Sequence, residues 1–165
     1  MNYAPNKVIG DDEAGFRGVS DEVHRMEGWD FVIAGSGLYN NLDCSFAAGY
    51  EDSTFQYPES QPGGGSRALR QQLKILSEFI NSVDVVRMAP DNAVIKGTPP
   101  DGTARALVER GRVMAIHLRR NRTASGSTNP AAAPGQSTAP SALHVDLSDG
   151  TWRAEWLNPT TGSVV

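Results

Sequence analysis

Residues 66–83 read SRALRQQLKILSEFINSV and carry the most regular pattern in the chain. The apolar residues that recur at helical spacing are Leu69, Leu73, Leu76, Ile80 and Val83, and most charged and amide side chains fall outside this stripe. Ser66 suits the N-cap position, because its hydroxyl can accept a hydrogen bond from a backbone N–H of the first turn. The stretch therefore predicts an amphipathic helix with one buried face.

A second helical pattern lies upstream, from Ser20 to about Ala34. Ser20 is its predicted N-cap, and the acidic residues that follow it suit the helix dipole. Short apolar runs at 7–9 and within 38–46 precede the two helices. This order of strand, helix, strand and helix predicts βα units on a parallel sheet. Two units cannot cover both faces of a sheet, so either the fold is incomplete or something outside the chain completes it.

From about residue 93 the apolar residues alternate with polar ones at period two. The stretches 143–147 and 152–156 show this alternation, and residues 109–112 are typical of a hairpin turn. The pattern predicts antiparallel strands as in a β-sandwich. Trp152 and Trp156 would then lie in the sandwich core, with an exposed sugar-stacking platform as the alternative.

Apart from Arg122, residues 121–141 are all Asn, Thr, Ser, Gly, Ala, Pro or Gln, a composition that predicts a flexible loop. The last residues, 162–165, follow a turn-like stretch and predict a strand that begins and is cut off.

Composition narrows the functional classes. The chain has 165 residues, of which 39% are hydrophobic and 21% charged, so it can bury a core as one domain or parts of two. A net charge of −4 argues against a nucleic-acid or other phosphate-binding surface. The single cysteine, Cys44, excludes an intrachain disulfide and a cysteine-rich zinc site. No apolar run predicts a membrane span, and the first residues lack the apolar stretch of a secretory signal.

An acidic stretch, Asp11-Asp12-Glu13, directly follows the first predicted strand. In a parallel α/β barrel, residues just past the strand ends face the active site. A carboxylate there can act as nucleophile or general acid/base in glycoside hydrolysis, which for retention needs two carboxylates about 5 Å apart. Taken alone, three acids in a loop more commonly indicate a solvated surface or the start of a helix.

Residues 49–65 mix aromatic side chains with carboxylates and amides, which suits sugar binding, although a long surface loop has the same composition. The three glycines before the second helix could approach an anion, but no Lys-Ser or Lys-Thr pair follows them to make a phosphate-binding P-loop. The histidines show no metal-binding spacing and are interpreted as structural or surface residues, and the cysteine as a packed thiol. No metal or cofactor is predicted.

Three stretches resemble one known family: WDFVIAGSGLYNNLDCSF at 29–46, YPESQPGGG at 57–65 and DGTWRAEWLNPTTG at 149–162. They are similar to the late barrel and the C-terminal β-sandwich of apiosidase-like glycoside hydrolases. The resemblance implies an α/β part followed by an all-β part. Residues 1–90 would be the last βα units of a TIM barrel. Residues 91–165 would be a partial antiparallel β-sandwich, labelled in that family as collagen-binding, with the flexible loop inside it.

The resemblance also implies a set of site residues. Glu13 matches the nucleophile of a retaining glycosidase, and the predicted substrate-contacting residues are Asp12, Tyr39, Asp43, Glu51, Tyr57 and Glu59. Six barrel strands, with the acid/base among them, have no counterpart, so we expect a fragment truncated at both ends and inactive alone. The predicted partner is a carbohydrate, with no nucleic acid or membrane; collagen binding rests on the family label.

Two alternatives to the glycosidase stay open. In the first, the sandwich is a non-catalytic module that binds carbohydrate or a fibrous protein, and the first half is only its base. In the second, the chain is an interaction protein with a degenerate barrel. The family is often secreted, but the sequence leaves the compartment of this chain undecided.

Overall fold

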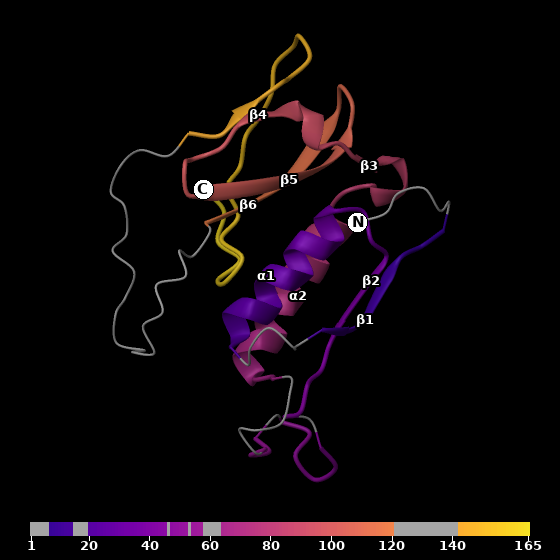
Figure 1. Ribbon diagram of the computed structural model, residues 1–165, viewed down its shortest axis with the longest axis vertical. Helices are drawn as coiled ribbons and strands as arrows, with labels where there is room; N and C mark the ends of the chain where they lie inside the picture. The colour runs from indigo at the N-terminus through magenta and orange to yellow at the C-terminus, as the bar shows by residue number, and fades with distance from the viewer. Residues whose placement is uncertain (1–6, 15–19, 46, 53, 58–63, 121–141) are drawn as a thin grey trace.

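Two parallel helices, α1 (Asp21–Ile33) and α2 (Arg67–Asn81), form the centre of the molecule (Figure 1). Their N-termini are adjacent, because Ser66 Oγ donates a 2.6 Å hydrogen bond to Asp21 Oδ2. Further along both helices, Arg25 Nη1 donates to Gln72 Oε1 at 2.6 Å. The computed structural model describes residues 7–14, 20–45, 47–52, 54–57, 64–120 and 142–165.

Both predicted helices and both predicted N-caps are confirmed. The Ser20 hydroxyl accepts a hydrogen bond from the Val23 backbone N–H at 3.4 Å, and the Ser66 hydroxyl accepts one from Leu69 at 2.9 Å. Each cap satisfies an N–H of the first turn that has no partner within the helix.

Strands β1 (Gly10–Ala14) and β2 (Leu38–Asn41) pair in parallel on one side of α1, and α1 is the crossover between them. The predicted βα order of the first half is therefore confirmed. The strand positions differ from the prediction, since β1 begins just after the apolar run at 7–9 and β2 ends before Leu42.

The remaining described strands are antiparallel. The longest pair, β5 (Gly102–Glu109) and β6 (Val113–Arg120), forms a hairpin whose turn lies at 109–112, as predicted. Gly111 has a φ of +76° in this turn, a conformation that side chains with a Cβ rarely adopt. The short elements around the hairpin are β3 (Ala89–Pro90), which pairs with β5, β4 (Ile95–Gly97), which pairs with β7 (His144–Val145), and the 3₁₀ turns η1 (Val85–Arg87) and η2 (Asn92–Val94).

One apolar core joins the helices to the hairpin. Its buried members come from α1, α2, β5, β6 and the turn before β3, and they are Trp29, Ile33, Leu76, Met88, Leu107 and Ala115. A second, smaller cluster of Val94, Ala106 and Val108 lies on the other face of β5. The hairpin is thus covered by helices on one face and by η2 on the other.

The predicted fold class is wrong. The chain forms a small mixed α/β domain with two α-helices and several antiparallel strands among its described residues, not the end of a TIM barrel plus a β-sandwich. A sandwich needs two sheets that bury their inner faces against each other. Here one face of the β5–β6 hairpin is buried against α1 and α2 instead of against a second sheet. The parallel pair of β1 and β2 covers the opposite side of α1 (Figure 1).

The prediction of a strand at 152–156 is also wrong. Residues 152–155 pair with no strand, and Trp156 exchanges backbone hydrogen bonds with Val165 at 2.9 and 3.0 Å beside an isolated bridge between Leu157 and Val164. Trp156 is 57% exposed, so it does not lie in a sandwich core. Residues 121–141, predicted to be a flexible loop, lie outside the described residues.

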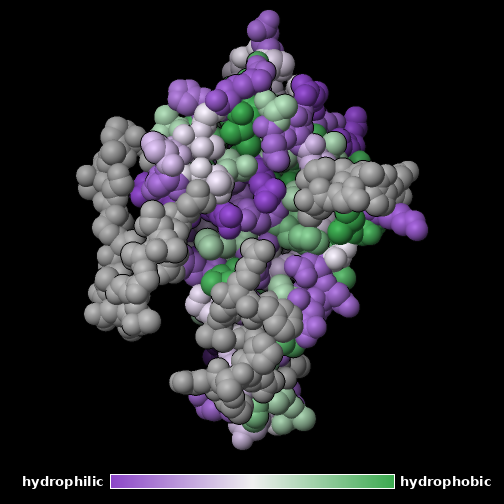
Figure 2. All heavy atoms as spheres, viewed as in Figure 1, coloured by the Kyte–Doolittle hydropathy of each residue, from purple (hydrophilic) through white to green (hydrophobic). Residues whose placement is uncertain are grey.

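The described surface is mixed in character. Polar and apolar residues alternate over the described parts of the face in Figure 2, without one continuous apolar area. No helix in the described part of the chain is long and apolar enough to cross a membrane.

Candidate functional site

An open hollow of about 810 Å³ lies at the carboxyl ends of β1 and β2. This edge of a parallel sheet is where open α/β folds bind ligands. Both strands and the first turn of α2 contribute to its walls. The described residues that line it are Asp12, Glu13, Asn40, Asn41, Leu42, Asp43 and Arg70.

An irregularity in β1 positions Asp12 and Glu13. Asp11 is opposite Tyr39 and Ala14 is opposite Asn41, so β1 advances three residues while β2 advances two. Such bulges change the direction of side chains and occur next to active sites. Asp12 and Glu13 are exposed, and neither makes an ion pair within the described residues. The side-chain amide of Asn40 donates to the Asp12 carbonyl at 2.9 Å and holds the bulge against β2.

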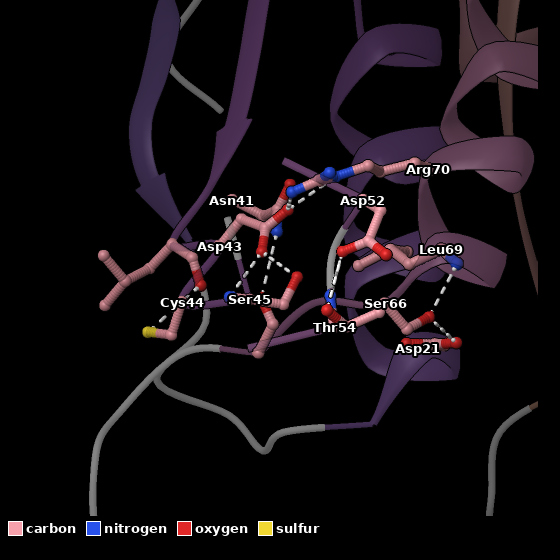
Figure 3. Close-up of polar contacts among 12 residues, drawn as sticks. Asp21, Asn41, Asp43, Cys44, Ser45, Asp52, Thr54, Ser66, Leu69 and Arg70 are labelled. Atoms are coloured by element: carbon pink, nitrogen blue, oxygen red, sulfur yellow. Dashed lines mark hydrogen bonds and ion pairs between the residues drawn. The ribbon is translucent and has the colours of Figure 1, made fainter. Parts of the chain in front are cut away.

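Asp43 differs from Asp12 and Glu13, because both of its carboxylate oxygens accept hydrogen bonds from neighbouring residues (Figure 3). Its Oδ1 accepts from the backbone N–H of Ser45 at 2.9 Å and from the Ser45 hydroxyl at 2.7 Å. Its Oδ2 accepts from Arg70 Nε at 3.1 Å and from Arg70 Nη2 at 2.8 Å. Asp43, Ser45 and Arg70 form what we call the clasp, which joins the end of β2 to α2.

The electrostatics of the clasp keep Asp43 ionised. Burial alone would raise the pKa of Asp43, but the hydrogen bonds from Ser45 and Arg70 and the charge of Arg70 outweigh it and lower the pKa. The carboxylate and the guanidinium compensate each other's charge. Asp43 therefore stabilises the wall of the hollow and has little capacity left to bind a ligand.

Gly65 is required where the loop before α2 passes the clasp. A Cβ at this position would lie 2.1 Å from Asp43 Oδ1 and 3.0 Å from the Ser45 hydroxyl. The adjacent Gly64 N–H donates to the Leu42 carbonyl at 2.9 Å. Gly65 thus allows close contact between the loop before α2 and the end of β2, and this contact explains the glycine without an anion.

Within the described part of the chain, the other predicted substrate-contacting residues do not line the hollow. The Tyr39 hydroxyl donates to the His24 carbonyl at 2.9 Å, and burial together with the charges of Glu27 and Asp11 raises the pKa of this phenol. Glu51 is exposed and accepts a hydrogen bond from the Gly49 N–H, and Tyr57 is half-buried outside the lining. Glu59 lies outside the described residues.

Four residues of the lining were not predicted as site residues: Asn40, Asn41, Leu42 and Arg70. The first three follow from the true position of β2, which ends at Asn41 rather than beyond Leu42. Arg70 lies in the first turn of α2. This position in the predicted helix is the sequence feature from which its place beside the strand ends could have been predicted.

A second polar cluster lies on the other side of α1, where the helix meets the hairpin. Asp30 Oδ1 lies 3.0 Å from His117 Nδ1 and 3.6 Å from Arg105 Nε, and Asp30 Oδ2 lies 3.1 Å from Arg119 Nη1. Burial would raise the pKa of Asp30, but the hydrogen bond to His117 and the three basic groups lower it. We call this set the junction.

The remaining polar clusters do not suggest a metal centre, since no three histidine, cysteine, aspartate or glutamate side chains of the described chain gather to hold an ion. Cys44 is half-buried with its Sγ 4.0 Å from the Leu42 carbonyl oxygen. Comparisons with protein-family models, with curated proteins and with solved structures find no match. The resemblance to apiosidase-like glycoside hydrolases therefore stays a prediction.

Proposed function

We propose that the hollow binds a carbohydrate and that Glu13 is the carboxylate that acts on the glycosidic bond in a glycoside-hydrolase-like protein. The observation that carries the proposal is the gathering of two unpaired carboxylates and two asparagines at the ends of paired parallel strands. Sugar hydroxyls both donate and accept hydrogen bonds. Carboxylates and amides supply the complementary groups in an open site that an extended chain of sugars can enter.

The chemistry of retention sets a limit on what this chain can do. The nucleophilic carboxylate attacks the anomeric carbon, while a second carboxyl group, about 5 Å away, protonates the leaving oxygen. Asp43 cannot be that acid, because both of its oxygens are occupied within the clasp and its pKa is lowered. We therefore expect these 165 residues to bind sugar without hydrolysing it.

The test is a titration of the ¹⁵N-labelled chain with neutral xylo- and cello-oligosaccharides, followed by NMR. The amide signals of Asp12, Glu13 and Asn40 should shift, and those of β6 should not. Glu13→Ala should weaken binding about fivefold, since the loss of one hydrogen bond to a ligand costs about 1 kcal/mol. Asp149→Ala is the matched control, because Asp149 is an exposed carboxylate that does not line the hollow.

Two results would reject the proposal. Saturating sugar that shifts no signal would reject carbohydrate binding, and shifts confined to residues around the exposed Trp156 would favour the stacking platform instead. Reducing ends released by this chain alone would contradict the expectation that it is inactive.

A further inference from the structure

The charges around the hollow do not cancel. Arg70 is the basic residue among the described lining, and its guanidinium makes hydrogen bonds to Asp43 through Nε and Nη2. The ion pair between them removes one positive and one negative charge from the balance. Asp12 and Glu13 then leave the hollow with two negative charges that no described basic group compensates.

The lining offers a ligand no separate positive group. Asn40 and Asn41 are neutral, and the amide nitrogens of both already donate to backbone carbonyls, Asn40 to Asp12 and Asn41 to Gly64. Each of these amides keeps a second N–H and a carbonyl oxygen, whereas the carboxylates of Asp12 and Glu13 can only accept hydrogen bonds. The unoccupied groups of the hollow are therefore mostly hydrogen-bond acceptors, which suits a ligand rich in donors.

We propose that the hollow selects saccharides that carry an ammonium group, that is amino sugars, over neutral sugars, and that it rejects uronic acids. This inference rests on the proposed carbohydrate binding and adds its charge class. An ammonium group supplies three donors and a positive charge to Asp12 and Glu13. A uronate would bring a third carboxylate to the same space, and like charges there repel.

The expected selectivity is moderate, because both carboxylates are exposed to water. At a separation of about 4 Å in water, one charge pair changes an affinity about fivefold. Salt must weaken the preference, since the Debye length falls to about 3 Å at 1 M ionic strength. A preference that came from shape alone would not respond to salt in this way.

The experiment compares three oligosaccharides of equal length at about pH 6, where the amine is protonated: glucosamine, N-acetylglucosamine and galacturonate oligomers. Calorimetry should give an affinity about fivefold higher for the glucosamine oligomer than for the N-acetylated one, and the weakest binding for the galacturonate oligomer. Asp12→Asn should lower the ratio of glucosamine to N-acetylglucosamine affinity, and Asp149→Asn should leave that ratio unchanged. Raising the salt to about 1 M should bring the ratio close to one.

The outcomes separate this inference from the proposed function. Binding of the neutral or galacturonate oligomer as tight as that of the glucosamine oligomer would overturn the charge selectivity and leave carbohydrate binding standing. A preference for glucosamine that neither Asp12→Asn nor salt reduces would overturn the role of the hollow in it. If no oligomer binds, carbohydrate binding itself is wrong.

Discussion

The junction and the hollow lie on opposite sides of α1 and use carboxylates in opposite ways. At the junction, Asp30 is surrounded by His117, Arg105 and Arg119, and only 19% of its side chain is exposed. In the hollow, Glu13 is exposed and makes no ion pair within the described residues. One carboxylate is committed to holding elements together, and the other is left available to a ligand.

This difference separates the acidic residues that we propose to bind a ligand from those that stabilise the fold. A carboxylate whose hydrogen-bonding capacity is filled inside the protein contributes to stability and is costly to remove. An exposed carboxylate without partners contributes little to stability, so its removal should be felt mainly in binding. Asp43 lies in the hollow yet belongs to the first kind, so position in a cavity alone does not make a binding residue.

The largest effect is expected where the junction meets the core. Trp29 is 5% exposed, with its ring centroid 5.1 Å from that of Phe79 and 5.9 Å from that of His117. Trp29→Ala should lower the free energy of unfolding by about 3–5 kcal/mol, because it leaves a large cavity between α1, α2 and the hairpin. Urea denaturation measures this change.

Trp156→Ala is the matched control for Trp29. Since Trp156 is 57% exposed, its removal should change the free energy of unfolding by no more than about 0.5 kcal/mol. Equal losses in the two variants would mean that the helices and the hairpin do not share one core.

Asp30→Asn should have the next largest effect. The substitution leaves His117, Arg105 and Arg119 without their shared anion, which should cost about 2 kcal/mol at neutral pH. The pKa of Asp30 is lowered by folding, so its contribution is present above the unfolded pKa of about 3.9 and is lost as the pH falls through the folded value. The stability difference between the native chain and Asp30→Asn should therefore shrink below about pH 4.

Thermal unfolding of both chains from neutral pH to about pH 2 tests this dependence. The control is Asp146→Asn, which removes a more exposed carboxylate from its ion pair with Lys96 and should cost less than about 0.5 kcal/mol. A stability difference that stays constant on acidification would show that the charge of Asp30 does not hold the junction.

Much of the local structure could be predicted from the sequence. The helices follow from apolar spacing and serine caps, and the turn of the β5–β6 hairpin follows from its polar residues around Gly111. These features depend on neighbours close in the chain. The alternation in 152–156 was misleading, because alternation indicates two different faces but not the partner strand that an extended segment needs. There, Leu157 packs on the core and Trp156 stays exposed.

The candidate site, like the fold, could be predicted from the sequence only in part. The sequence predicts Asp12 and Glu13 just past a strand at 7–9, whereas the structure places both within β1, near its carboxyl end. The roles of Tyr39 and Asp43 could not be predicted, because their partners are distant in sequence: the Tyr39 hydroxyl bonds to the backbone of His24, and Asp43 to Arg70, 27 residues away. No local pattern distinguishes a carboxylate that a distant arginine will occupy from one that stays available.

The smallest expected effects lie within the hollow, where Asp43 and Glu13 can be compared by isosteric substitution. Asp43→Asn should cost about 1 kcal/mol, because the amide nitrogen that replaces one oxygen cannot accept from Ser45 or Arg70. Glu13→Gln removes a charge without partners beside Asp12, so the free energy of unfolding should change by less than about 0.5 kcal/mol. Urea denaturation at low ionic strength resolves the two. A larger loss of unfolding free energy in Glu13→Gln than in Asp43→Asn would mean that Glu13 is the structural carboxylate. The ligand-binding site would then have to lie elsewhere in the molecule.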